Sequence, residues 1–440
     1  MTRNPHKIKP KVVAMAVIIL LVTAAGSTSG EQPPTTTFEG RQEPNSDLLS
    51  GTVQGYLRHA ALNSADLKAA FEQWQTAAAS VPNAKAILDP KLTYGYYIQE
   101  VETGRQRVGV SQTFGLFGKK AAAESEAEAK AEAARLKYEE MKFQLFLEVK
   151  EAFYEYVYLT KATETTQEHL ATLARVEDAA DERYSLTAAG VADVTFARME
   201  MAGLENMLEE LKHLTAPTAV KLNSFLNRPK DAQLARPEPE EFKPVQLNRT
   251  IVVDMLRQKN PELAKLDKEI EAAMDKGKLA RAQFYPDIGV GIDFIRTEQT
   301  ITSGIRPDEK DLMFLMLSMS VPLGRDSYKA AQLQTKMDIQ KKEQERMEAE
   351  NNMLARAIQA MYDYEDSSSH IRLYKNGLLA KSENLLKTLE KKYYAGTRNL
   401  ADLINTGRVS LSYRLGYEKA LAINRQKLAE LEMLTGTKLD

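Results

Sequence analysis

Two stretches of the chain have a composition that predicts long, uninterrupted helices. Residues 119–184 contain no proline and no internal glycine, and Ala, Glu, Lys, Leu and Arg are abundant. Residues 326–394 have the same character, with Gly377 as their one internal glycine. At 1.5 Å per residue, each helix would be on the order of 100 Å long. Apolar residues recur at heptad-like spacing, for example at Leu145 and Val149, which predicts coiled-coil packing between neighbouring helices.

A period-two alternation precedes each long helix and predicts a β-hairpin. In the first hairpin, at about residues 92–114, Leu92, Tyr94 and Tyr96 alternate with polar or small residues. The second hairpin, at about residues 288–321, has the same alternation in its first strand. Strands of about ten residues with this pattern are long enough to cross an outer membrane when tilted. The alternative is that both hairpins are ordinary caps on a helical bundle.

The two halves of the chain are related by an internal duplication. Leu67 and Leu263 occupy matching helix starts 196 positions apart. Gly118 and Gly324, at the strand-to-helix junctions, are 206 apart because the second hairpin has a longer loop, and the offset reaches 209 within the long helices. Each repeat therefore reads helix, hairpin, very long helix, tight turn, helix.

The N-terminus predicts export. Basic residues precede an apolar run from Val12 to Ala25, and small residues follow, as in a secretory signal peptide. The alternative, a membrane anchor, would need about 20 apolar residues. We expect a signal peptide over residues 1–26 and an extended tether, rich in Pro, Thr, Glu and Gln, over residues 27–48.

The rest of the chain divides into the two repeats and a linker. We expect a first repeat over residues 49–227, an inter-repeat linker with several prolines over 228–247, and a second repeat over 248–440. Pro217 lies within the returning helix of the first repeat, where we expect a kink or a break.

Charge and composition exclude several classes of function. The net charge is −2 with 27% charged residues, so there is no basic excess to hold nucleic acid. The absence of cysteine excludes disulfides and thiolate metal sites. Met313, Met316 and Met319 could suggest a metal relay, but their positions alternate between strand faces and favour packing. No catalytic constellation is present, so we expect neither an enzyme nor a bound cofactor or metal.

The number of predicted strands requires oligomerisation if the hairpins enter a membrane. Four strands cannot close a barrel, because bacterial barrels have at least about eight, and sheet edges exposed to lipid are not tolerated. Three copies would give about twelve strands, a plausible pore.

The turn motifs are similar to those of a known family. Residues 393–403, which read Tyr-Tyr-Ala-Gly-Thr-Arg-Asn-Leu-Ala-Asp-Leu, and residues 183–198 of the first repeat resemble the paired turns of TolC-like outer-membrane efflux proteins. These are the outer membrane factors of tripartite efflux and type I secretion systems. The strand-to-helix junctions Phe117-Gly118 and Pro322-Leu323-Gly324 also resemble that family, and the resemblance covers nearly the whole mature chain.

The resemblance implies a mainly α fold with a membrane β-barrel. The family forms a homotrimer, with a twelve-stranded β-barrel in the outer membrane and a twelve-helix α-barrel tunnel extending into the periplasm. It conducts substrates passively from a periplasmic adaptor protein and an inner-membrane pump to the exterior. The expected partners are sister copies, these two proteins and outer-membrane lipid, with no nucleic acid. A periplasmic adaptor and an exported coiled-coil structural protein are the alternatives; the duplication opposes the first and the alternating hairpins oppose the second.

The resemblance also implies a gate at the periplasmic tip. Asp193 and Arg398 would meet across neighbouring hairpins as a charge-assisted hydrogen bond, with Tyr393 as a second donor. Asp402 would line the constriction, where carboxylates favour cations, and Asn405 stands where the family often has a second acid.

The turns themselves suggest further roles. Gly190 and Gly396 can adopt the positive φ of a tight helix–helix turn. For Asp193 and Asp402, an alternative role is N-capping of the returning helices.

If Asp193 and Arg398 form a latch, alanine at either position should raise the single-channel conductance of the reconstituted protein. Unchanged conductance in both variants would exclude the latch.

Overall fold

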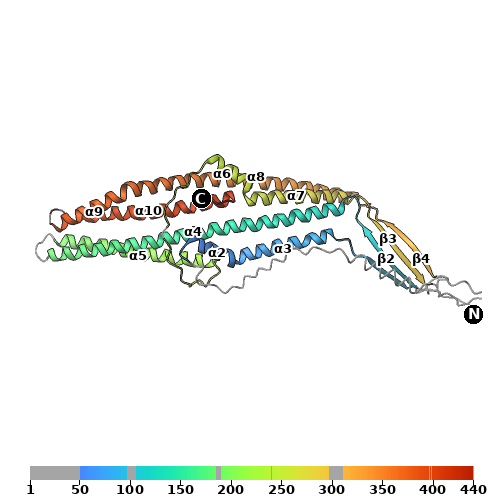
Figure 1. The fold of residues 1–440 in the computed structure, drawn as a ribbon, viewed down its shortest axis with the longest axis horizontal. Helices are drawn as coiled ribbons and strands as arrows, with labels where there is room; N and C mark the ends of the chain where they lie inside the picture. Colours follow the sequence, from blue (N-terminus) through green and yellow to red (C-terminus); the bar gives the residue numbers. More distant parts are fainter. Residues whose placement is uncertain are drawn as a thin grey trace, which may run out of the picture. The chain divides into compact units, whose positions relative to one another are not determined.

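The computed structural model describes residues 50–96, 106–184, 190–238, 240–296, 311–395, 397 and 399–439, with residues 182–184 and 190 described by their backbone alone. All of them belong to one unit, residues 41–440. Within this unit long helices lie side by side, and a four-stranded sheet continues from one of their ends (Figure 1). None of the helices in these ranges has an apolar stretch long enough to cross a membrane.

The first half of the chain forms two short helices, a hairpin, one very long helix and a returning helix. In order these are α2 (Val53–Asn63), α3 (Ala65–Lys85), β1 (Lys91–Tyr96), β2 (Gln106–Phe114), α4 (Lys119–Tyr184) and α5 (Gly190–Phe225). α4 is uninterrupted over these residues because its sequence lacks helix-breaking residues. Ion pairs one turn apart add stability along its surface, such as Lys130 with Glu126 at 2.6 Å.

The second half forms the same order of elements. These are α6 (Arg249–Lys259), α7 (Pro261–Ala282), β3 (Ile288–Arg296), β4 (Leu312–Met319), α8 (Arg325–Leu373), the π-helical turn η2 (Tyr374–Leu378), α9 (Leu379–Tyr394) and α10 (Leu400–Thr435). The prediction of one regular helix over residues 326–394 is therefore only partly right. The interruption contains Gly377, and at Gly416 of α10 a Cβ would come within 2.7 Å of the Tyr374 hydroxyl, so α10 approaches the π turn closely.

Of the kink or break expected at Pro217, the break does not occur, because α5 continues through this residue. A proline inside a helix removes one backbone hydrogen bond. Packing against α4 holds the helix on both sides of that position: Leu211 contributes to a cluster with Leu159, and Leu222 is fully buried in a cluster with Phe153. Tertiary contacts thus outweigh the local preference.

Each repeat has its own apolar core where its short helix meets the long ones. In the first, Tyr56 of α2 packs on Phe153 of α4 with ring centroids 5.0 Å apart. In the second, Leu256 of α6 lies with Met361 of α8 and Leu431 of α10.

Asn260 joins α6 to α7 and ties both to the C-terminal helix. Its side-chain oxygen accepts hydrogen bonds from the backbone N–H groups of Glu262 (2.8 Å) and Leu263 (3.0 Å), which caps α7. Its side-chain nitrogen donates to the carbonyl of Leu434 at 2.8 Å, and the residue is 3% exposed. Ser64 has the matching place in the first repeat and accepts from the N–H of Leu67.

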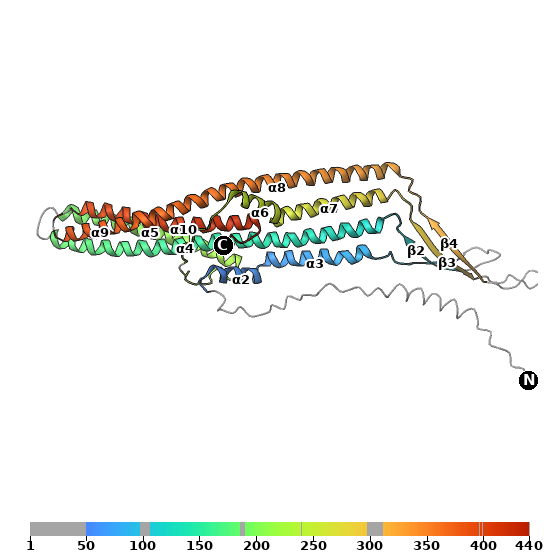
Figure 2. The ribbon, with the colours of Figure 1, turned by 45° about the horizontal axis from the view of Figure 1, so that its top comes forward.

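The helices and strands nearest the sheet are arranged in the same order. Helices α3, α4, α7 and α8 lie next to one another in that sequence (Figure 2), and the sheet order is β1-β2-β3-β4. β1 follows α3, β2 precedes α4, β3 follows α7 and β4 precedes α8. Each strand is therefore the continuation of one helix.

Replacing Asn260 with alanine should lower the free energy of unfolding by about 2–4 kcal/mol, because the change removes a cap and a buried donor to the Leu434 carbonyl. Asn248→Ala is a matched control: Asn248 caps α6 from an exposed position, with a hydrogen bond from the Thr250 N–H at 2.9 Å. Its loss should cost about 1 kcal/mol. Urea unfolding followed by far-UV circular dichroism in detergent compares the two, and equal losses would contradict this role of Asn260.

Candidate functional site

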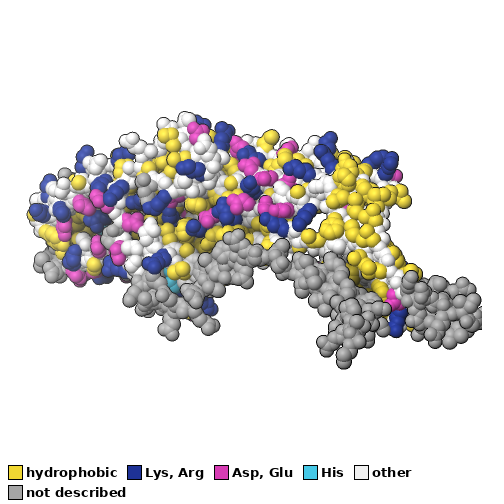
Figure 3. All heavy atoms as spheres, turned by 45° about the vertical axis from the view of Figure 1, so that its right-hand side comes forward, with side chains coloured by type: hydrophobic (Ala, Val, Ile, Leu, Met, Phe, Trp, Pro, Cys, Tyr) yellow, Lys and Arg dark blue, Asp and Glu magenta, His cyan; other side chains and the backbone are white. Residues whose placement is uncertain are grey.

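The register of the sheet separates its side chains into two faces of different chemistry. Tyr94, Val108, Phe294 and Met313 stand in line across the four strands, and so do Leu92, Val110, Ile292 and Leu315. This apolar face is open to the surroundings, as Leu317 at 75% exposure illustrates. Figure 3 shows hydrophobic side chains gathered around the strands and their junctions with the helices. An exposed apolar surface of this kind marks contact with lipid or with another protein.

The opposite face is small and polar over much of its area. Thr93, Gly109, Ser111, Gly289 and Ser318 lie on it, as the pairing of their strands requires. Met316 is also on this face, whereas Met313 and Met319 are on the apolar face, so the three methionines do not converge. Within the described ranges, no group of three or more His, Asp or Glu residues could hold a metal ion.

The borders of the sheet are open in the part of the chain that the structure describes. β1 pairs with β2 alone and β4 pairs with β3 alone, so each outer strand has hydrogen-bonding groups on its far side. Exposed strand edges of this kind are sites for pairing with another chain.

The junction between β2 and α4 joins the two repeats. Phe117 adopts φ +58° and Gly118 φ +82°, both in the left-handed region. The Phe117 ring stacks on Tyr285 at 4.9 Å. Lys119 donates to the Tyr285 carbonyl at 2.8 Å and pairs with Asp287 at 2.7 Å. The sequence marks this turn by its Phe-Gly pair, and the contacts with Tyr285 and Asp287 hold it in place.

At the other end of the long helices, the two helical hairpins pack together through one apolar cluster. It unites Leu173 and Val176 of α4, Val194 of α5 and Leu400 of α10. Tyr393 of α9 belongs to it and is 2% exposed. Tyr393 is therefore packed among apolar side chains near the end of α9.

The other predicted tip residues have different surroundings. Asp193 is half-buried in the first turn of α5, which begins at Gly190, and Asp402 is half-buried in the first turn of α10. Asn405 is exposed. Gly396 and Arg398 lie outside the described residues, so the Asp193–Arg398 pair stays a prediction.

The alternative N-capping role is wrong for both aspartates. The cap of α10 is Asn399, whose side-chain oxygen accepts a hydrogen bond from the Asp402 N–H at 3.1 Å. Asp193 lies inside the first turn of its helix. In such positions a carboxylate interacts favourably with the positive end of the helix dipole.

An ion pair that the sequence did not predict links the two hairpins. Arg408 of α10 donates from Nε to Glu200 of α5 at 2.7 Å, and a second guanidinium nitrogen bonds the same carboxylate oxygen. Glu200 is buried. Hydrogen bonding to Glu200 raises the pKa of Arg408, so this cation stays charged. Arg198, by contrast, pairs with Glu177 at 2.7 Å within a single hairpin.

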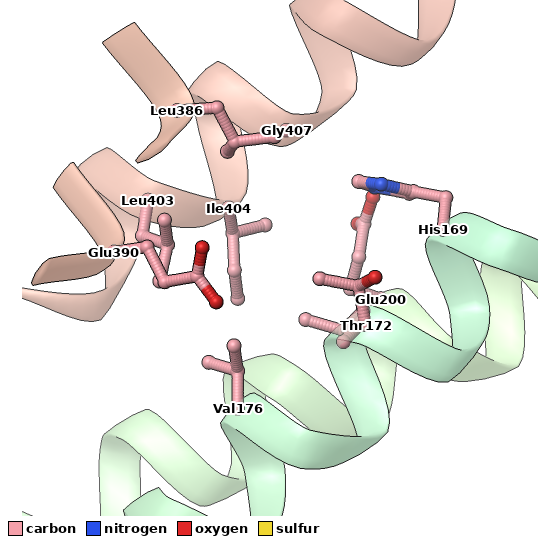
Figure 4. A pocket seen from close by; sticks show the side chains of 10 residues that line it. His169, Thr172, Val176, Glu200, Leu386, Glu390, Leu403, Ile404 and Gly407 are labelled. Carbon is pink, nitrogen blue, oxygen red and sulfur yellow. The ribbon is translucent and has the colours of Figure 1, made fainter. Parts of the chain in front are cut away.

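A small cavity of about 30 Å³ lies beside this ion pair, where α4 and α5 face α9 and α10. Figure 4 shows His169 and Glu200 on one side, with Leu386, Leu403 and Ile404 on the other. A Cβ at Gly407 would approach His169 Cε1 to 2.9 Å, so the glycine permits this contact. Burial lowers the pKa of His169, which is therefore neutral at pH 7.

Several solved structures have the same fold. CusC matches with a TM-score of 0.72 at 14% identity, over 91% of this chain and 96% of that chain. VceC from Vibrio cholerae, an outer membrane protein, matches with a TM-score of 0.70 at 14% identity, over 88% and 97%. The open state of the MtrE outer membrane channel from Neisseria gonorrhoeae matches with a TM-score of 0.69 at 16% identity, over 88% and 89%. No curated protein sequence matches the chain.

The sequence itself identifies the family. It matches the family described as outer membrane efflux protein over residues 56–228 and 252–437, which together make up most of the chain. The two matched ranges contain both hairpins and both long helices. Members of this family are channel proteins of the outer membrane. The chain therefore belongs to the outer membrane efflux protein family.

Proposed function

We propose that this protein is the outer-membrane channel component of a tripartite efflux pump. It passively conducts substrates, received from a periplasmic adaptor protein and an inner-membrane pump, to the exterior. The observation that carries the proposal is a sheet with one exposed apolar face, one largely polar face and, among the described residues, no partner strand at either border. Such a sheet suits a membrane only when its borders are paired and its apolar face meets lipid.

The direction of the outer strands supports closure by sister copies. All neighbouring strands are antiparallel, so β1 and β4 run in opposite directions. When β4 of one copy meets β1 of the next, the new pair is antiparallel as well. In a homotrimer, three sheets of four strands make a twelve-stranded barrel. Because the helices share the strand order, α8 would meet α3 of the neighbouring copy and build a twelve-helix tunnel below the barrel.

The proposal includes the processing and division of the chain expected from its sequence. A signal peptide, residues 1–26, would be removed on export, and residues 27–48 would act as a tether. Two repeats, 49–227 and 248–440, would then flank the linker at 228–247. The order of elements in the two halves supports this division.

The proposal also places a closed entrance at the tip of the helical hairpins. The residues proposed to form it are Asp193, Tyr393, Arg398, Asp402 and Asn405, with turn glycines Gly190 and Gly396. To this set we add the Arg408–Glu200 pair, because it connects α10 with α5 and so ties one hairpin to the other. Opening would require the two hairpins to separate, and the pair opposes that movement.

Leu315→Lys should reduce assembly in the outer membrane, because a cation on a lipid-facing side chain costs about 2–4 kcal/mol near the midplane. Met316→Lys is the matched control, since the adjacent side chain projects from the opposite face of β4. The readout is the fraction of protein recovered as trimer from sarkosyl-insoluble membranes. A wild-type chain found in the soluble fraction, or equal recovery of both variants, would contradict the proposal.

Arg408→Ala should raise the conductance of the resting channel in planar bilayers, because it removes the cross-hairpin pair. Arg198→Ala serves as the control, since its partner Glu177 is in the same hairpin. If the two variants conduct alike, the pair does not hold the entrance closed.

A further inference from the structure

We propose that Arg107 and Asp293 line the pore within the membrane and set the charge preference of the channel's exit. This inference rests on the proposed function, because the polar face becomes the lumen only when the sheet closes with its apolar face outward. It assigns a specificity-determining pair to the barrel, far along the chain from the tip residues considered above.

The pair spans the contact between the two repeats. Arg107 of β2 donates from Nε to Asp293 Oδ1 at 3.1 Å and from Nη2 to Oδ2 at 2.7 Å, a bidentate geometry. In the register of the sheet, Asp293 is opposite Gly109, and Arg107 is opposite Ile295. Both charged side chains therefore project from the polar face.

Two neighbouring residues, Gly109 and Phe314, accommodate the Arg107–Asp293 pair. A Cβ at Gly109 would overlap the Asp293 carboxylate, so only glycine leaves room for it. The Arg107 guanidinium carbon lies 5.7 Å from the centre of the Phe314 ring, within the range of a cation–π contact. The Arg107 side chain is 34% exposed and that of Asp293 2%. The guanidinium thus covers the carboxylate and is the group that a passing solute meets.

Few other charges share this face. Among the described residues of the four strands, the remaining one is Lys91, which pairs with Ser111 at the end nearer the helices. Arg107 precedes Ser111 by four residues in β2, so it lies roughly 13 Å further from the helices. Threefold symmetry would place three copies of the pair at one level of the lumen. At that level the Asp293 carboxylate offsets the charge of Arg107, so removing either charge would change the charge of the pore lining there.

The test is ion selectivity of the full mature protein in planar bilayers under a KCl gradient. Asp293→Asn makes each chain one unit more positive and should shift the potassium-to-chloride permeability ratio toward chloride. Arg107→Gln should shift it toward potassium. Each shift should be about two- to fivefold, as expected for unit charges acting across water at short range. The double variant restores the charge balance and should return close to the wild-type ratio.

Arg107→Lys distinguishes pore charge from a purely structural role. It keeps the charge and loses the bidentate geometry, so the ratio should stay near wild type, whereas a structural role predicts the same defect as Arg107→Gln. If Asp293→Asn does not assemble as a trimer, the comparison of Arg107→Gln with Arg107→Lys still decides. A wild-type protein that forms no channel would overturn the proposed function. A conducting wild type whose ratio is unchanged in the assembled single variants would overturn this inference alone.

Discussion

The covalent continuity of each strand with one helix is the constraint on which the rest of the structure depends. It makes the order of the strands equal to the order of the helices, so the outer strands β1 and β4 lie on the same sides as the outer helices α3 and α8. Contacts between the repeats follow the same line from sheet to helices: Arg107 with Asp293, Lys119 with Asp287, and Lys265 with Glu140 at 2.6 Å. An assembly that pairs β1 and β4 of neighbouring copies therefore also brings together α3 and α8 of those copies. The ring of strands and the ring of helices would close together.

Local signals in the sequence were sufficient for most of the fold. The absence of proline and glycine predicted that α4 is unbroken, and period-two alternation located the strands, because both signals act over a few residues. At Pro217 the helix does not break, because packing of Leu211 and Leu222 against α4 outweighs one lost hydrogen bond. Asp402 was a plausible N-cap of α10, but Asn399 is the N-cap. The sequence does not fix the first residue of the helix to within a few positions, so it could not distinguish the two.

The candidate site could be predicted only in part. The turn motif suggested roles for Tyr393 and Asp402 at the tip. Nothing in the local sequence joins Arg408 to Glu200, which are far apart in the chain and meet only when the hairpins pack. The same holds for Arg107 and Asp293 in the sheet. In the sheet, the alternation of apolar residues with glycine or polar residues was visible in the sequence. The reason for glycine at position 109 is the space that the Asp293 carboxylate needs, and this follows only from the register between the two repeats.

The π turn η2 lies in a segment where the second repeat is one residue longer than the first. The offset between matching residues is 208 at Ala152 and Ala360 but 209 at Tyr184 and Tyr393, so the second long helix has one residue more than the first between these points. Tyr374–Leu378 falls in that interval. A π turn closes its hydrogen bonds over one residue more than an α turn, so it takes up an insertion without rotating the rest of the helix. The extra residue was absorbed locally, and the apolar side of α9 kept facing α10.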